Sequence, residues 1–189
     1  MTRLIAITGK IGSGKSTVGR ILSEKGYPVV DCDRINRVLL SDDAYLSGLK
    51  DLFPEEFVNG ILDKKILSAI VFSDVAARRK LNEYAHGRIF NQAFAEAQRY
   101  DGIVFIEVPL LFGSGYEKRF EKIILVTSDD EKKADRLKKR DNRDEAESKA
   151  VLVAQRYDMP SDLPILSVKN DGSISDLASS VDLLLCEIE

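Results

Sequence analysis

The chain has 189 residues, of which 44% are hydrophobic and 31% are charged, and its formal net charge is −3. This length suits one domain, or one domain with an insertion, that buries a substantial core. A mildly acidic chain does not match a nucleic-acid binder, which usually shows a basic surface, so we expect no nucleic-acid partner.

No apolar run reaches the roughly 18 residues that a membrane span needs, so we expect no membrane partner. The start of the chain becomes glycine-rich too early for a signal peptide, which predicts a cytoplasmic protein. We expect a monomer or a weak homo-oligomer. The two cysteines, Cys32 and Cys186, lie far apart, and His86 is the only histidine. This pattern argues against a cysteine zinc site and a disulfide scaffold, and predicts two reduced, packed cysteines.

Five short apolar runs predict buried strands, because each is bounded by glycine, proline or polar residues. They cover residues 4–7, 27–30, 103–108, 123–126 and 165–168. After the first run, apolar residues recur at helical spacing up to Gly26, which is the expected helix stop. After the last run they do so again, and Ser175 or Asp176 is the expected N-cap of that helix. Strands that alternate with helices predict an α/β fold with a five-stranded parallel sheet and helices on both faces.

Residues 34–101 are different, because amphipathic helical stretches dominate them and no strong strand signal is found there. The stretches are 35–40, 44–52, 65–72 and 75–100. Residues 130–157 are highly charged and helical in pattern. We therefore expect a core made of residues 1–33, 102–129 and 158–189, a helical insertion of residues 34–101, and a separate segment of residues 130–157.

Polar residues gather where the predicted strands end, and ligands of parallel sheets bind beyond the carboxyl ends of the strands. These residues should therefore share one rim of the sheet. They are Thr8, Asp31, Asp33, Pro109 and Ser128.

Residues 9–16 read Gly-Lys-Ile-Gly-Ser-Gly-Lys-Ser and match G-x-x-x-x-G-K-[ST], the phosphate-binding loop or P-loop. Its glycines allow a tight turn that points amide N–H groups at phosphate oxygens, and the following helix adds its positive end. The pattern predicts that Lys15 reaches the β- and γ-phosphates of ATP and that Ser16 ligates Mg²⁺. The predicted nucleotide-binding residues of this region are Gly9, Gly12, Ser13, Gly14, Lys15, Ser16 and Thr17.

Acidic residues follow two of the predicted strands. Phosphoryl transfer to an alcohol needs a group that orients the hydroxyl and accepts its proton. Asp33 is the candidate base, although Asp31 and Asp33 could equally do no more than cap the following helix. Glu107 closes the third strand in the manner of a Walker B carboxylate, and would hold Mg²⁺ or its water.

Seven basic residues crowd the segment after the fourth strand: Lys132, Lys133, Arg136, Lys138, Lys139, Arg140 and Arg143. Arg136 and Arg140 are four residues apart and share a helix face. A mobile lid carrying Arg140 would stabilise charge on the transferring group and exclude water. The alternative is a solvated helix laced with salt bridges, which is the usual meaning of a charge run and suits the outer lysines.

Taken together, these residues resemble the dephospho-CoA kinase family over essentially the whole chain. The matching segments are residues 7–17, Val30-Asp-Cys-Asp33, Leu62-Asp-Lys64 with Ile70-Val-Phe72, His86, Val108-Pro-Leu-Leu-Phe112, Arg136-Leu-Lys-Lys-Arg140, Gln155 and Asn170. The resemblance implies a P-loop core, a helical domain (residues 34–101) that binds the CoA precursor, and a lid (residues 130–157). It also implies transfer of the ATP γ-phosphate to the ribose 3′-hydroxyl of dephospho-CoA, a small-molecule substrate.

The resemblance further implies roles for single residues. Asp33 would be the base and Arg140 the lid arginine on the phosphates, while Arg136 and Asn170 would bind the nucleotide, Asn170 near adenine. Thr8, His86, Pro109, Leu110 and Leu111 would line the acceptor side, together with Asp33.

Five positions depart from the usual pattern of that family: Lys10, Lys64, Gly87, Gly113 and Val151. They bear on acceptor affinity and rate more than on reaction type, because Lys15, Ser16, Asp33 and Arg140 are all kept. Two alternatives stay open at this point. One is another small-molecule P-loop kinase, for a nucleoside monophosphate or shikimate, and the other is a nucleotide-binding switch without transferase activity.

Overall fold

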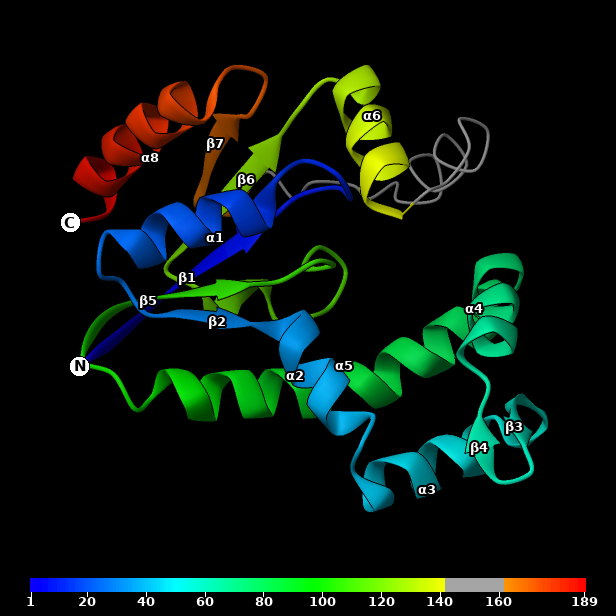
Figure 1. Cartoon of the computed structure of the whole chain (residues 1–189). Coiled ribbons are helices and arrows are strands. Elements are labelled where there is room, and N and C mark those ends of the chain that lie inside the picture. The colour runs from blue at the N-terminus through cyan, green and yellow to red at the C-terminus, as the bar shows by residue number, and fades with distance from the viewer. Residues whose placement is uncertain (142–161) are drawn as a thin grey trace. The chain divides into compact units, whose positions relative to one another are not determined.

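The computed structural model describes residues 1–141 and 162–189. These residues form two compact units (Figure 1). The first, called the sheet unit here, comprises Met1–Asp31 and Ala95–Glu189, and the second, called the helical unit, comprises Cys32–Phe94. The chain thus leaves the sheet unit after its second strand and returns to it inside a long helix.

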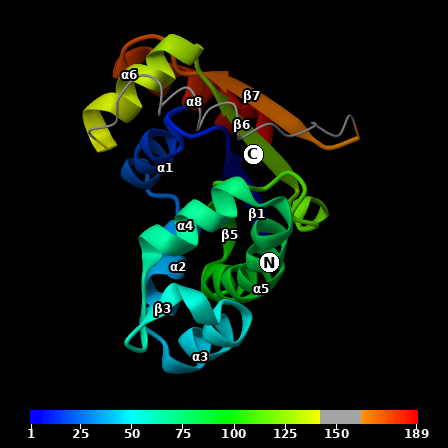
Figure 2. The ribbon, with the colours of Figure 1, turned by 90° about the vertical axis from the view of Figure 1, so that its right-hand side faces the viewer.

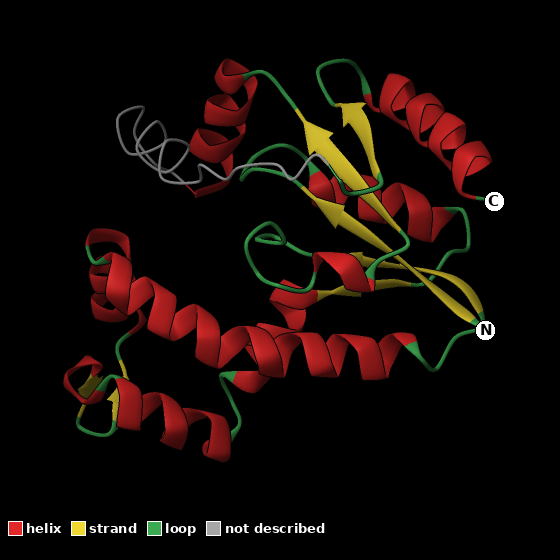
Figure 3. Ribbon diagram, turned by 180° about the vertical axis from the view of Figure 1, so that it is seen from behind, coloured by secondary structure: helices red, strands yellow, loops and turns green. Residues whose placement is uncertain are grey.

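A five-stranded parallel sheet organises the sheet unit, in the order β2-β5-β1-β6-β7 (Figures 1 and 3). The strands are β1 (Thr2–Thr8), β2 (Val29–Asp31), β5 (Gly102–Glu107), β6 (Lys122–Thr127) and β7 (Ile165–Lys169). Every neighbouring pair is parallel, so the carboxyl ends of all five strands lie along one edge. The predicted parallel sheet is confirmed, and β1 is its central strand.

Both faces of the sheet are buried, as the continuous apolar runs of the sequence require. Ile5 and Ile7 point to one face, where α1 (Lys15–Glu24) and α8 (Ile174–Ile188) supply the opposing apolar side chains. Ala6 and Val104 point to the other face and are also fully buried. Helices on both sides give the three-layer α/β arrangement that the sequence predicts (Figure 3).

The ends of α1 and α8 show how local sequence sets helix limits. The N–H of Gly26, at φ 93°, donates to Ser23 O, and the next N–H, of Tyr27, donates to Leu22 O, which together form a Schellman stop. The predicted stop at Gly26 is therefore confirmed. Ser173, by contrast, begins α8 through a reciprocal capping box with Asp176, so the N-cap expected at Ser175 or Asp176 was placed too late.

Four helices make up most of the helical unit (Figure 2): α2 (Cys32–Leu39), α3 (Asp43–Leu52), α4 (Lys64–Ser73) and α5 (Val75–Ala97), which runs on into the sheet unit. A short 3₁₀ turn covers Pro54–Glu56. The core of the unit is built around Tyr45, Leu49, Phe53 and Leu67. Helices α3 and α4 each start at an aspartate whose carboxylate accepts backbone N–H groups, Asp42 for α3 and Asp63 for α4.

The helical unit also contains a small hairpin of two-residue strands, in a region where the sequence shows no strong strand signal. β3 (Phe57–Val58) pairs antiparallel with β4 (Ile61–Leu62) across Asn59-Gly60. Both turn residues have positive φ, 51° and 81°, as a two-residue hairpin turn demands. The Asn-Gly pair between apolar residues was the sequence signal, and it was missed because each strand is only two residues long.

The remaining described elements belong to the sheet unit: a 3₁₀ turn at Glu117–Arg119 and the helix α6 (Asp130–Asp141). The two cysteines form no disulfide; Cys32 is buried and Cys186 is exposed, so the expected packing holds for the first and is wrong for the second. Among the described helices, none is both long and apolar enough to cross a bilayer.

Candidate active site

The P-loop, residues 9–16, connects the central strand β1 to α1 (Figure 1). Gly9, Gly12 and Gly14 have φ of 150°, 76° and 99°, a backbone region that other residues rarely adopt. Space is also limiting, because a Cβ atom on Gly9 would lie 2.2 Å from Val126 O on the neighbouring strand β6. The glycines of the motif are therefore required by backbone conformation and by close packing at the sheet edge.

Lys15 is the first residue of α1, and Gly14, its N-cap, has no side chain to cover the helix terminus. The Lys15 ammonium donates to Gly9 O at 3.0 Å and to Lys10 O at 3.2 Å, so the side chain folds back along the loop. A positive charge and the positive end of a helix thus lie at the same turn. This combination favours a bound anion such as a phosphate chain.

Ser16 and Glu107 meet beside the loop: the Ser16 hydroxyl donates to a Glu107 carboxylate oxygen at 2.7 Å. The Glu107 side chain is buried, whereas Ser16 is exposed, so the pair opens to solvent on one side. Strand register places Asp31 next to Glu107 on the adjacent strand β2, and paired residues of parallel strands point to the same face.

This donor set fits Mg²⁺, which favours oxygen ligands and usually binds through one or two carboxylates together with waters and substrate phosphates. Among residues 1–141 and 162–189, no group of three or more His, Cys, Asp or Glu side chains could hold a metal ion by itself. A hydroxyl with one carboxylate therefore suits an ion that arrives with a nucleotide, rather than one held permanently by the protein.

Arg136 of α6 and Asn170, which follows β7, both contact the P-loop in the sheet unit. The Arg136 guanidinium donates through Nη1 to Gly12 O at 3.1 Å and to Ser13 O at 3.3 Å. The Asn170 amide donates to Ser13 O at 2.8 Å. Both predicted nucleotide-binding residues thus lie at the loop, and they bind its carbonyl oxygens.

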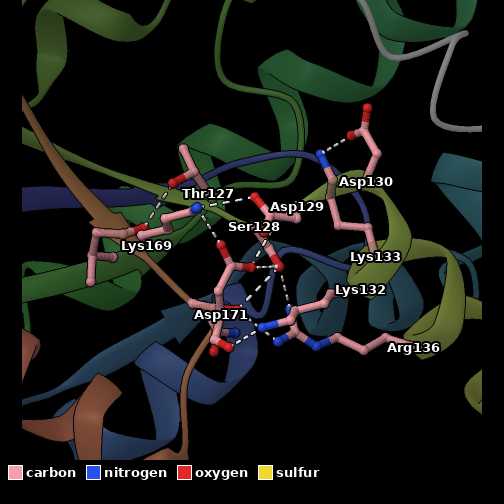
Figure 4. Close-up of polar contacts among 11 residues, drawn as sticks. Thr127, Ser128, Asp129, Asp130, Lys132, Lys133, Arg136, Lys169 and Asp171 are labelled. Atoms are coloured by element: carbon pink, nitrogen blue, oxygen red, sulfur yellow. Dashed lines mark hydrogen bonds and ion pairs between the residues drawn. The ribbon is translucent and has the colours of Figure 1, made fainter.

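Three further residues join this region: Ser128, Lys169 and Asp171 (Figure 4). One Asp171 oxygen accepts from the Ser128 hydroxyl at 2.7 Å and from the Asp129 N–H at 2.9 Å. The other pairs with the Lys169 ammonium at 2.8 Å. These bonds, that to Lys169 above all, hold the pKa of Asp171 well below its ordinary value, so the carboxylate is charged at neutral pH.

Of these three, the sequence had marked only Ser128, as a residue at a strand end. Asp171 was missed because a single aspartate in a loop after a strand has no distinctive pattern. Asp171 lies beside Ser128 because β7, which precedes Asp171, pairs with β6, which precedes Ser128. Only the strand order could have revealed this contact.

The predicted base, Asp33, is an exposed residue in the first turn of α2, the first helix of the helical unit. The helix starts at Cys32, so Asp33 lies inside it rather than before it. His86 is half-buried in α5, with its ring edge-on to Phe90 at 6.1 Å between centroids. Both residues belong to the helical unit, separate from the P-loop unit.

The predicted acceptor-lining residues of the sheet unit differ in exposure. Thr8 ends β1 and is 2% exposed, and Leu111 is fully buried in the interior. Leu110, between half-buried Pro109 and Leu111, is 44% exposed. Leu110 therefore presents the apolar side chain that a ligand could contact, while Leu111 anchors the loop after β5.

Most of the predicted lid, residues 130–157, lies outside the described residues. Its first part is α6, which ends at Asp141. The backbone of Arg140 belongs to this helix, but its side chain lies outside the described part of the chain, as does Gln155.

Comparison with known proteins gives a consistent result. A sequence profile of the family described as dephospho-CoA kinase matches residues 3–176. A dephospho-CoA kinase from Thermus thermophilus is 35% identical over 190 residues, covering 98% of this chain and 91% of the relative. One from Lactobacillus acidophilus is 31% identical over 197 residues, covering 100% and 98%. The crystal structure of a Thermus thermophilus protein superposes with a TM-score of 0.81 at 34% identity, covering 100% and 98%.

Proposed function

The chain belongs to the dephospho-CoA kinase family, and we propose that its P-loop, Glu107 and Asp33 together carry out phosphoryl transfer to the ribose 3′-hydroxyl. The protein is a transferase of CoA biosynthesis that phosphorylates dephospho-CoA at the expense of ATP. The observation that supports this assignment of the site is the Ser16–Glu107 hydrogen bond, 2.7 Å long, beside a P-loop built on three glycines of positive φ.

On this proposal the P-loop binds the triphosphate of ATP. Its amide N–H groups, the start of α1 and the Lys15 ammonium offer positive potential to the β- and γ-phosphates. Ser16 and Glu107 would hold Mg²⁺, which when bound neutralises charge on the same phosphates. Thr17, in the first turn of α1, would donate to the α-phosphate.

Asp33 is the proposed base. Its carboxylate would accept the proton of the acceptor hydroxyl while that oxygen attacks the γ-phosphorus. The bond between the γ-phosphorus and the β-phosphate oxygen then breaks, and ADP leaves. Support comes from chain position, because Asp33 follows the carboxyl end of β2 by two residues and is exposed.

The helical unit is the proposed acceptor-binding part, with His86 as a candidate contact to dephospho-CoA. Exposed Leu110, in the sheet unit, is a further candidate contact. The segment of residues 130–157 is the proposed lid, and Arg140 is its proposed phosphate contact. Lid closure would exclude water from the transferring group, which protects ATP from hydrolysis.

An ADP-release assay tests the proposal. Purified protein, ATP and Mg²⁺ are incubated with dephospho-CoA, AMP, adenosine or shikimate in parallel. We expect rapid ADP release with dephospho-CoA alone, and a product phosphorylated at the ribose 3′-hydroxyl. Faster release with AMP or shikimate would contradict the acceptor assignment, and nucleotide binding without release for any acceptor would contradict catalysis.

A further inference from the structure

The outer surface of the P-loop is held by two side chains that are far from it in sequence. A loop that turns its N–H groups toward phosphate must turn the carbonyl oxygens of the same peptides away from it. Arg136 binds the carbonyl oxygens of Gly12 and Ser13, and Asn170 binds that of Ser13. We call Arg136 and Asn170 the loop clamp.

The loop clamp fits closely against the backbone. Ser13 is fully buried and Asn170 is 7% exposed. A Cβ atom on Gly14 would lie only 2.0 Å from the Asn170 amide nitrogen, and one on Gly12 would lie 2.9 Å from Lys133 O in α6. The loop therefore has little room to shift outward unless the clamp moves with it.

The clamp is in turn oriented by the bonds around Asp171 (Figure 4). Arg136 Nη2 donates to Asn170 O at 2.7 Å, which joins the two clamp residues. Arg136 Nη1 also donates to the Ser128 hydroxyl at 3.1 Å, and Ser128 is held by the Asp171 carboxylate at 2.7 Å. A chain of direct contacts thus runs from Asp171 through Ser128 and Arg136 to the P-loop.

Lys169 above all, with the Asp129 N–H and the Ser128 hydroxyl, stabilises Asp171 in its ionised form. Lys169 on β7 pairs with it, and Lys132 on α6 donates to its backbone carbonyl oxygen. Asp129, after β6, donates its N–H to Asp171, and its own carboxylate pairs with Lys169 at 3.0 Å. Asp171 therefore links the ends of β6 and β7 through its carboxylate and the start of α6 through its backbone carbonyl oxygen.

We propose that Asp171 is a positioning residue for ATP: acting through Ser128 and the loop clamp, it fixes residues 12–14 in the conformation that binds the phosphates. On this basis Arg136 binds the carbonyl oxygens of the P-loop, and the planar, two-pronged shape of its guanidinium matters more for ATP binding than its charge does. The inference rests on the proposed function, because it assumes that the P-loop binds ATP.

The test compares Asp171→Asn with Asp182→Asn. Each change keeps the side-chain shape and removes one lysine pair, but the Lys25–Asp182 pair lies between α1 and α8 without contact to the clamp. We expect Asp171→Asn to raise KM for ATP about tenfold, as expected for losing hydrogen bonds to a charged group. KM for dephospho-CoA should stay within about twofold. The control variant should match the wild type.

Arg136→Lys and Arg136→Met separate geometry from charge. If the two-pronged shape is what matters, both should raise KM for ATP by similar amounts, because the single nitrogen of lysine cannot replace both Nη1, which binds the loop carbonyls and Ser128, and Nη2, which binds Asn170 O. Combining Arg136→Lys with Asp171→Asn should then add little, since both act through one chain of contacts. Full recovery by lysine, or independent effects of the two changes, would overturn the inference.

Two further measurements keep the result interpretable. Equilibrium binding of ATP, measured without acceptor, reports whether the P-loop binds the nucleotide even if dephospho-CoA is not the substrate. Failure of the inference is therefore distinct from failure of the proposed function. Ser128→Ala provides a second route if Asp171→Asn does not fold. Unchanged ATP binding by whichever of the two variants folds would disprove the role of Asp171.

A pH series of unfolding supplies an independent check. Because folding lowers the pKa of Asp171, its contribution to stability is present above the ordinary aspartate pKa and is lost as pH falls through the folded value. The stability difference between wild type and Asp171→Asn should be constant from pH 5 to 8 and shrink below about pH 4. A difference that persists at low pH would contradict a role for the charge.

Discussion

The side-chain contacts within the sheet unit differ from those within the helical unit. In the sheet unit, polar residues at strand ends bind backbone groups of a loop, as Asn170 binds Ser13 O. In the helical unit, apolar and aromatic side chains pack around Tyr45 and Leu49, and the Tyr84 hydroxyl donates to Tyr45 O at 2.8 Å. The first arrangement fixes the conformation of the P-loop, and the second forms a packed core.

This difference leads to separable expectations. Changes at the P-loop should impair nucleotide chemistry, whereas changes in the helical core should reduce stability and leave ATP binding intact. The predictions below test that separation, starting with the largest expected effect.

Lys15→Ala should have the largest effect. It removes the ammonium that lies over the loop carbonyls and is proposed to contact the β- and γ-phosphates. We expect kcat to fall by about 10³-fold, the upper range for loss of a group that stabilises transition-state charge. Steady-state ADP release measures it, with unfolding temperature as the control. A loss below about tenfold would contradict the role of Lys15.

Asp33→Asn comes next, because it keeps the shape of the proposed base but cannot accept a proton. We expect kcat to fall by at least about 10²-fold, with equilibrium ATP binding unchanged. Asp43→Asn, in the first turn of the next helix, is a matched control that should remain active. Near-normal turnover by Asp33→Asn would contradict the role of Asp33 as the base, and would indicate a purely structural role in the first turn of α2.

Gly48→Ala tests the helical core. A Cβ atom at Gly48 would lie 2.3 Å from the Tyr84 hydroxyl oxygen, although helix propensity by itself favours alanine. We expect a net destabilisation of about 1–3 kcal/mol from overpacking, with unchanged ATP binding. Denaturant unfolding measures the change.

Tyr84→Phe supplies the partner for a double-mutant cycle. Alone it should cost about 1 kcal/mol, because it removes the hydrogen bond to Tyr45 O. Together with Gly48→Ala it should cost less than the sum, because the nearest clashing atom is gone. Additive effects, or a stabilising Gly48→Ala change, would show that the two helices adjust freely at this contact.

The hairpin offers a smaller effect than the overpacking expected for Gly48→Ala. Asn59 has φ of 51°, so Asn59→Ala should destabilise the protein by about 1–2 kcal/mol, whereas Asn59→Gly should be close to neutral. Thermal unfolding with ATP-binding measurements distinguishes the two. Equal stability of the alanine and glycine variants would indicate that this turn does not constrain the helical unit.

The sequence was sufficient for features specified by local patterns. The apolar runs 4–7 and 103–108 predicted β1 and β5. Ser16 and Glu107 lie in contact, and their binding of Mg²⁺ stays a prediction. Gly26 marked a helix end because few other residues adopt its conformation.

Other features depend on the order of the strands in the sheet, which the sequence of any one strand does not reveal. The contact of Asp171 with Ser128 exists because β6 and β7 are neighbours, so neither residue shows it in the sequence. The contacts of Arg136 and Asn170 with the loop carbonyls had no sequence signal, and the contact of these residues with the nucleotide stays a prediction. The start of α8 at Ser173 was missed because several serines and aspartates there could each have been a cap.

The central position of β1 has a consequence for motion. β1 is bonded to β5 on one side and β6 on the other, whereas β2 has three residues and a single neighbour. The amide hydrogens of β1, the strand that leads into the P-loop, should therefore be among the slowest in the protein to exchange with solvent. Those of Val29–Asp31 should exchange much sooner. We therefore expect the segment that leads to Asp33 to open locally without opening of β1.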